Sequence, residues 1–346
     1  MRTDHLLTQR LLIAAFFVLA GSRSSQAQDS NVPRADLLAQ QAGALLTDFA
    51  AEPSDVSQVG YSASKTCSSC ESCSACQSCR SGCCRRGTLL QWSYGTSFSG
   101  GPDLDEPLVT DRPDFTEASV TVGEGVSQLE FGYTYIYDNE AGESTRTQSL
   151  GEALLRYGIF ADWLEFRIQA FPVEQQTNAA GIKKSTSGME DMYVGFKIAL
   201  TPQEGCLPEM ALLPQAFVPA GSKAFTREEV LPGLNWIYSW ELTDNISTAG
   251  STQVNRAIDD MTTDAHLLFA QSWTVAYSLC ENLGAYTEWF ALIRSSADTD
   301  RTTHFFNGGF TYLISDDVQW DIRAGVGLNG AAADYFFGSG LSIRYQ

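Results

Sequence analysis

The stretch Gln319-Trp320-Asp321-Ile322-Arg323-Ala324-Gly325-Val326 alternates strictly between polar or small residues and apolar ones. An alternation with a period of two is typical of a β-strand, because successive side chains point to opposite faces of a sheet. One face of this strand would be entirely apolar, and the other would carry both an acid and a base. The stretch therefore predicts a strand that separates an apolar environment from a polar one.

The same alternation recurs from Val126 to the end of the chain. Most of the predicted strands are about eleven residues long, which is the length that a tilted transmembrane strand requires. This is about twice the usual length of a strand in a soluble sheet. The predicted strands lie near 127–137, 147–157, 163–173, 189–200, 209–219, 231–241, 244–254, 264–278, 282–293, 302–314, 317–328 and 335–345.

The connections between these strands also follow a pattern. Those after the first, third, fifth, seventh and ninth strands are expected to be long, and those after the second, sixth, eighth and tenth to be tight turns. Long loops at one end and short turns at the other are typical of outer-membrane barrels. The sequence thus predicts an all-β fold, an antiparallel transmembrane β-barrel of about 12 strands with a mostly irregular periplasmic segment before it.

The N-terminus has the features of a secretory signal peptide. Arg2 and Arg10 precede or flank a short apolar run, Leu11 to Ala20, that ends near Ala27. The run is too short to cross a bilayer as a helix. We therefore divide the chain into a signal peptide (1–27), a periplasmic segment (28–107) with one possible short helix at 34–50, and the barrel with its N-terminal lumen or mouth segment (108–346). A soluble secreted protein is the alternative at this step.

The periplasmic segment is low in complexity and rich in cysteine, with a spacing close to three residues. In an exported protein this pattern favours disulfides or cross-links to another chain. Zinc or iron–sulfur ligation is the alternative, although Ser, Gly and Arg fill the gaps where a folded knuckle would be needed. No cofactor is predicted. The seven candidates for disulfide or metal bonding are Cys67, Cys70, Cys73, Cys76, Cys79, Cys83 and Cys84.

Composition excludes some classes of function. The formal net charge is −19, so nucleic acid is not an expected partner. After residue 27 only His266 and His304 remain as histidines, and neither belongs to a nucleophile motif such as G-x-S-x-G. Gly325, Gly327 and Gly330 spell G-x-G-x-x-G, but no helix follows and no βαβ unit surrounds them. The sequence predicts that the protein is not an enzyme.

The polar faces of the predicted strands would line the lumen and bring acids and bases together there. These groups either neutralise one another as ion pairs or form a polar constriction that selects solutes. The lumen or pore-lining candidates, including two residues just before the first strand, are Arg112, Asp114, Glu130, Glu152, Arg156, Glu165, Arg167, Asp191, Lys197, Glu288, Asp321, Arg323 and Arg344.

The segment Thr110-Asp111-Arg112-Pro113-Asp114-Phe115-Thr116-Glu117 is unusually dense in charge for a linker. Pro113 removes a backbone donor, which disfavours regular pairing with a strand. We therefore expect this segment to fold into the periplasmic end of the lumen. Arg112 would pair with a lumen carboxylate, and Asp111 or Asp114 would face Arg156 or Arg167. The alternative is an exposed tether.

Three motifs together resemble a known family: Thr110 to Glu117, Leu155-Arg156-Tyr157-Gly158, and Gln319 to Leu328 followed by Asp334-Tyr335-Phe336. The chain from about residue 108 onward resembles the outer-membrane proteins of the "MetA-pathway of phenol degradation" family. The resemblance implies an outer-membrane barrel that moves small solutes, with aromatic compounds as one candidate class. It departs from the family at Gly330-Ala331-Ala332-Ala333, where acidic and proline residues are usual.

Two functions therefore remain open from the sequence. The first is a narrow channel or transporter for small solutes, whose partners would be outer-membrane lipid and the solute itself. The second is a structural envelope anchor whose cysteine-rich periplasmic segment cross-links or binds an envelope protein.

Overall fold

The computed structural model describes residues 87–90, 102–140, 142–259, 264–295 and 302–346. The expected signal peptide, the possible helix at 34–50 and the seven clustered cysteines lie outside the described residues. No helix among the described residues is long and apolar enough to cross a membrane.

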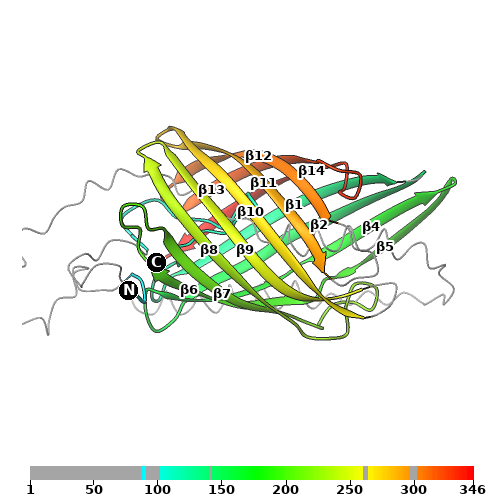
Figure 1. Ribbon diagram of the computed structural model, residues 1–346, viewed down its shortest axis with the longest axis horizontal. Coiled ribbons are helices and arrows are strands. Elements are labelled where there is room, and N and C mark those ends of the chain that lie inside the picture. Colours follow the sequence, from blue (N-terminus) through cyan, green and yellow to red (C-terminus); the bar gives the residue numbers. More distant parts are fainter. Residues whose placement is uncertain (1–86, 91–101, 141, 260–263, 296–301) are drawn as a thin grey trace, which may run out of the picture.

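Antiparallel strands form one sheet that closes on itself, because β1 pairs with both β2 and β14 (Figure 1). The strands are β1 (Ser127–Glu140), β2 (Glu143–Gly158), β3 (Leu164–Ala170), β4 (Pro172–Ala179), β5 (Ile182–Met189), β6 (Met192–Thr201), β7 (Glu209–Val218), β8 (Leu231–Thr243), β9 (Ile246–Ile258), β10 (Ala265–Cys280), β11 (Leu283–Ser295), β12 (Thr302–Ser315), β13 (Val318–Gly327) and β14 (Tyr335–Tyr345).

These fourteen strands form a barrel wall that is twelve strands around. β3 and β4 both pair with β2, and only Phe171 separates them, so they act as one long strand. In the same way β5 and β6 follow one another and pair with β4 and β3, respectively. Counting each of these two couples once leaves a closed antiparallel barrel of twelve strands, as the sequence predicted.

The two faces of the wall differ as the alternation requires. In β13, Trp320, Ile322 and Val326 are 43%, 36% and 48% exposed, whereas Gln319 and Asp321 are nearly inaccessible. A soluble barrel buries its apolar face, but here the apolar side chains point outward and the polar ones inward. This inverted arrangement fits a barrel whose outer surface is solvated by lipid.

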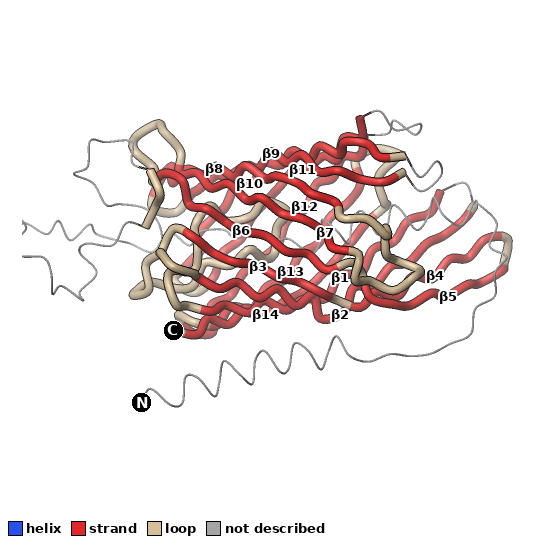
Figure 2. The backbone as a smooth tube through the Cα atoms, turned by 90° about the horizontal axis from the view of Figure 1, so that it is seen from below, coloured by secondary structure: helices blue, strands red, loops and turns tan. Residues whose placement is uncertain are grey.

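The connections differ in part from the sequence expectation. The expected long loops after the first and third strands are wrong, because β1 pairs with β2 up to Glu140 and Glu143, and β4 turns directly into β5 between Ala179 and Ile182. Residues 143–149 of β2 and the strands β4 and β5 are rich in Ser, Thr, Gln or Lys, so these parts lack the apolar face that marks a membrane strand, although the hydrogen-bonded ladder continues through them. Figures 1 and 2 show β4 and β5 reaching beyond the barrel at the end opposite the C-terminus.

Residues 108–126, which we call the plug loop, enter the barrel before β1 begins. Near the start of the loop, the Leu108 amide donates to the Asp316 carbonyl in the β12–β13 turn. Near its end, the Gly125 amide donates to Gly158 at the end of β2. The C-terminus lies at the same rim, where the Gln346 side chain donates to the Leu104 carbonyl. The plug loop therefore enters and leaves through one rim.

A charge placed on the lipid-facing surface should report the orientation of the wall. Ile322 lies in the middle of β13 and Leu328 just beyond its end, and both are exposed on the outside. We expect Ile322→Arg to lower the free energy of unfolding by about 2–4 kcal/mol, and Leu328→Arg by about 0–1 kcal/mol, because the cost depends on depth in the bilayer. Urea unfolding in lipid vesicles would measure both, and an equal effect of the two substitutions would contradict the assignment.

Candidate functional site

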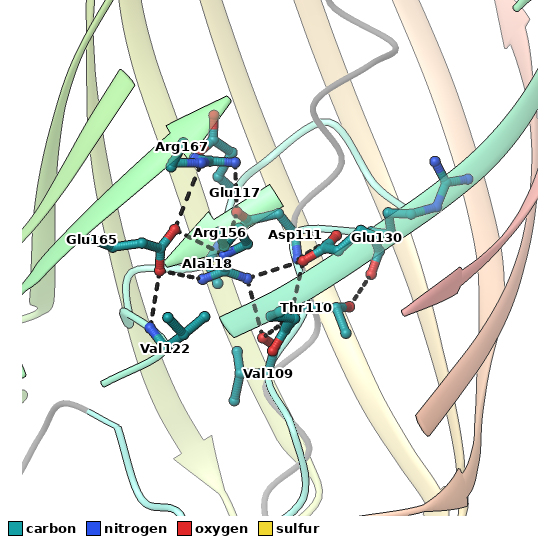
Figure 3. A network of polar contacts seen from close by, with 12 residues as sticks. Val109, Thr110, Asp111, Glu117, Ala118, Val122, Glu130, Arg156, Glu165 and Arg167 are labelled. Atoms are coloured by element: carbon teal, nitrogen blue, oxygen red, sulfur yellow. Dashed lines mark hydrogen bonds and ion pairs between the residues drawn. The ribbon is translucent and has the colours of Figure 1, made fainter. Parts of the chain in front are cut away.

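Asp111 lies at the centre of a group of ionised side chains inside the barrel. One carboxylate oxygen, Oδ1, is 2.7 Å from Lys197 Nζ, and the other, Oδ2, is 2.6 Å from Arg167 Nη2 and 3.3 Å from Arg156 Nε. These cations come from β6, β3 and β2, respectively. Figure 3 shows Arg156 and Arg167 next to Asp111 of the plug loop. One plug carboxylate thus connects three strands of the wall.

The surrounding acids complete this group. Glu117 of the plug loop contacts Arg167, and Glu165 of β3 accepts from Arg156 Nε at 2.8 Å and from the Val122 amide at 2.9 Å. Glu130 of β1 accepts from the Asp111 amide at 3.0 Å and lies 3.1 Å from Arg156 Nη1. All of these side chains are buried. Mutual pairing is what makes such burial tolerable, because an unpaired charge in the interior would be strongly destabilising.

The electrostatic environment favours the ionised form of Asp111. Burial alone would raise its pKa, but the three cations around the carboxylate outweigh that effect. They hold the pKa of Asp111 well below its ordinary value. The plug loop is therefore anchored by a carboxylate that stays charged at physiological pH.

Arg112 occupies a second polar site on the other side of the plug loop. Its Nη1 is 2.8 Å from Glu152 Oε2 and its Nε is 3.1 Å from Asp321 Oδ2. Glu152 reaches inward because a bulge interrupts β2 directly after Gly151. Gly151 and Glu152 both have a positive φ. A bulge adds one residue to a strand and so changes which residues face inward. The pairing of Arg112 with Glu152 is one of the contacts hypothesised from the sequence.

Two glycines make room for the Arg112 guanidinium. Gly132 of β1 and Gly340 of β14 are direct partners in the barrel wall. A Cβ atom at Gly132 would lie 1.9 Å from Arg112 Nη1, and one at Gly340 would lie 2.0 Å from Arg112 Nε. Any side chain at either position would displace the guanidinium. The sequence analysis missed this role, although glycine on the lumen face of a strand was the available signal.

The tip of the plug loop contacts a polar group on one side and an apolar group on the other. The Phe115 and Thr116 amides both donate to the Glu288 carboxylate at 2.7 Å, and Asn307 donates to it as well. The Phe115 ring stacks on Phe290 with a centroid distance of 4.6 Å. The apolar cluster around this stack comprises Phe115, Ile136, Leu268, Ala270, Phe290, Leu292, Phe305, Ala332, Ala333 and Phe336.

The remaining residues predicted to line the lumen make different contacts. Arg323 of β13 donates to the Pro113 carbonyl and to Thr134, and Asp114 is buried in the plug loop. Asp191 instead binds the amides of Gly221 and Arg227 and so holds the β7–β8 connection rather than the plug loop. Arg344 pairs with Asp317 at the rim near the C-terminus.

The sequence analysis missed two further contributions to the lumen. It did not single out Glu117, whose position in the charged motif was the available signal. It also missed the apolar cluster, because Phe290 and Phe305 face inward against the expectation of a polar lumen. Cys206 and Cys280, which lie outside the cysteine-rich segment, are exposed free thiols among the described residues.

The family profile described as "Putative MetA-pathway of phenol degradation" matches residues 110–345. No curated protein matches the sequence. Among solved structures, an outer membrane channel from Pseudomonas putida F1 is similar with 11% identity and a TM-score of 0.48, covering 64% of this chain and 96% of that one. The CymD monoaromatic hydrocarbon channel gives 11% identity and a TM-score of 0.35, covering 64% and 89%. The KdgM porin in complex with disordered oligogalacturonate gives 9% and 0.39, covering 63% and 99%.

Removing the charge of Asp111 should loosen the plug loop while the barrel remains folded. We expect Asp111→Asn to weaken docking by about 3–5 kcal/mol, because breaking a buried ion pair leaves uncompensated charge. Protease cleavage within 102–126 of the folded protein should then become at least about a hundredfold faster. Asp105→Asn is the matched control, since Asp105 is an exposed acid of the same segment. Equal cleavage of the two variants would show that Asp111 does not anchor the loop.

Proposed function

Because the chain belongs to the outer-membrane family described as "Putative MetA-pathway of phenol degradation", we propose that it is a narrow channel for small solutes, closed by its own plug loop. The observation that carries this proposal is how the lumen is filled. A continuous apolar core would close a barrel permanently, whereas here ion pairs and hydrogen bonds hold a separate loop against a charged wall, and apolar packing is confined to the tip of the loop. Such contacts are exchangeable with water or with a polar solute.

The size of the barrel supports a narrow pathway. A twelve-stranded barrel encloses more space than the eight-stranded type that side chains fill and less than a sixteen-stranded porin. The plug loop occupies part of that space and places Phe115 against an aromatic wall. Small solutes with aromatic character are the class that this lining fits, and the description of the family points to the same class.

The charges of the lumen do not support a strong preference for ions of one sign. Around Asp111, four acids face three bases, and around Arg112 two acids face one base. The large negative charge of the whole chain is therefore not concentrated in this site. Within this proposal, selection depends on size and on contact with the lining rather than on net charge.

The orientation is also part of the proposal. The plug loop, the C-terminus and the tight turns β8–β9, β10–β11 and β12–β13 all lie at one rim, and short turns face the periplasm in barrels of this type. The residues before the plug loop would then lie in the periplasm, where cysteines form disulfides. The alternative function as an envelope anchor depends on residues 67–84, which lie outside the described residues, and no comparison supports a protein partner there.

Deleting residues 108–118 should open the channel. The deletion removes Asp111 and Arg112, and with them the ion pairs that hold the loop to the wall. We therefore expect a larger single-channel conductance in planar bilayers and faster entry of small antibiotics into cells. Arg112→Ala should raise conductance by less, because the Asp111 contacts remain. Heat-modifiable mobility on gels would verify that both variants assemble. Unchanged conductance in an assembled deletion variant would refute closure by the plug loop.

A further inference from the structure

A row of carboxamide side chains lines the inner wall of β7, β8 and β9. It consists of Gln215, Asn235, Gln253 and Asn255, and all four are buried. Leu234 and Trp236 are exposed on the outer surface. Because side chains alternate along a strand, Asn235 between them faces inward. Neutral amides predominate here, in contrast with the charged wall around the plug loop.

The backbone is adapted to keep these amides together. Gln215 and Asn255 both pair with Gly233, from opposite sides of β8. The Gln215 amide donates to Asn255 Oδ1 at 2.9 Å across this glycine. A Cβ atom at Gly233 would lie 1.8 Å from Asn255 Oδ1, so only glycine allows the contact. On the other side, the Tyr193 hydroxyl lies 3.4 Å from Gln215 Oε1.

Part of the hydrogen-bonding capacity of the row is unused. Within the described residues, neither the Nδ2 nor the Oδ1 atom of Asn235 has a hydrogen-bond partner, and Asn255 Nδ2 has none either. Buried amides almost always have partners, and an unpartnered one needs an explanation. Asn235 is fully buried, and it lies directly beside Gln253 in the strand register.

The row borders the apolar cluster at the tip of the plug loop. The register places Gln253 beside Ala270 and Asn255 beside Leu268, and both β10 residues belong to that cluster. The tip of the plug loop lies at the next inward-facing pair of β9 and β10, where the Thr116 hydroxyl contacts Ser272 at 2.7 Å and Ser272 contacts Ser251 at 2.8 Å. A solute stopped by the plug loop would therefore meet amides on one part of the wall and apolar side chains on the adjacent part.

We propose that this carboxamide row is a solute-selecting subsite for uncharged ring compounds that carry hydroxyl groups. The inference rests on the proposed channel function and names the class of solute for it. A carboxamide both donates and accepts hydrogen bonds, as a hydroxyl group does, so the two match without any net charge. Leu268 and Ala270, which lie beside the row and belong to the apolar cluster, would contact the apolar part of such a solute. An anionic ring compound would lose its hydration against four uncharged side chains, which disfavours it.

Calorimetric titration of the full chain in detergent tests the subsite with resorcinol as the probe. Resorcinol is an uncharged ring with two hydroxyl groups, benzoate is a ring with a negative charge, and inositol has hydroxyl groups without an aromatic ring. We expect saturable binding of resorcinol and at least tenfold weaker binding of benzoate and inositol. Equal or tighter binding of either comparison compound would overturn the proposed class of solute.

Variants localise the binding. Asn235→Leu and Gln253→Leu should each weaken resorcinol binding about three- to tenfold, the loss expected for one hydrogen bond. Thr311→Val is the matched control, because Thr311 is a buried polar residue on β12, a strand that is not part of the row. Among the described residues its hydroxyl has no hydrogen-bond partner. Each substitution is tested singly, so that one variant that fails to assemble leaves the other informative. Unchanged affinity in an assembled Asn235 or Gln253 variant would overturn the assignment.

The two proposals fail in different ways. Conductance and solute flux measured on the same variants report the channel function, whereas calorimetry reports the subsite. Binding that depends on Asn235 in a barrel without flux would keep the subsite and refute the channel. Flux without any dependence on the carboxamides would do the reverse.

Discussion

Neutralisation of buried charge is the constraint on which the interior of this barrel depends. Asp111 of the plug loop brings one carboxylate into contact with cations from β2, β3 and β6. Without a partner, each of those cations would be buried at a large cost in free energy. The loop and the wall therefore need one another: the loop supplies acids to a wall with excess bases at this point, and the wall supplies acids to Arg112 on the other side.

The wall is shaped to receive the loop as well as charged to bind it. The bulge after Gly151 turns Glu152 inward, and the paired glycines Gly132 and Gly340 leave space for the guanidinium that Glu152 binds. Further along the loop, backbone amides rather than side chains contact the Glu288 carboxylate. Local irregularities in the strands thus coincide with contacts to the loop, which is where regular pairing alone would leave no room or no partner.

The sequence predicted those features that depend on local pattern. Alternation such as that from Gln319 to Val326 predicted the strands and their faces, and the charge density around Arg112 predicted contact with a lumen carboxylate. The long-range features were not predictable in this way. The two glycines that make room for Arg112 lie side by side only after β1 and β14 have paired. The side-chain contact between Gln215 and Asn255 likewise requires β7, β8 and β9 to be in register. The strand extensions at β4 and β5 were missed because both of their faces are polar, so hydrophobic alternation carries no information there.

The plug loop enters and leaves the barrel through the same rim, and this has a consequence for assembly. A chain threaded from one end of a cylinder to the other would have to be in place before the cylinder closed. A loop with both ends at one opening is not threaded, so pairing of β1 with β14 and insertion of the loop are topologically independent events. The order of these two events is then set by energy and not by connectivity, and withdrawal of the loop toward its own rim leaves every hydrogen bond between the strands intact.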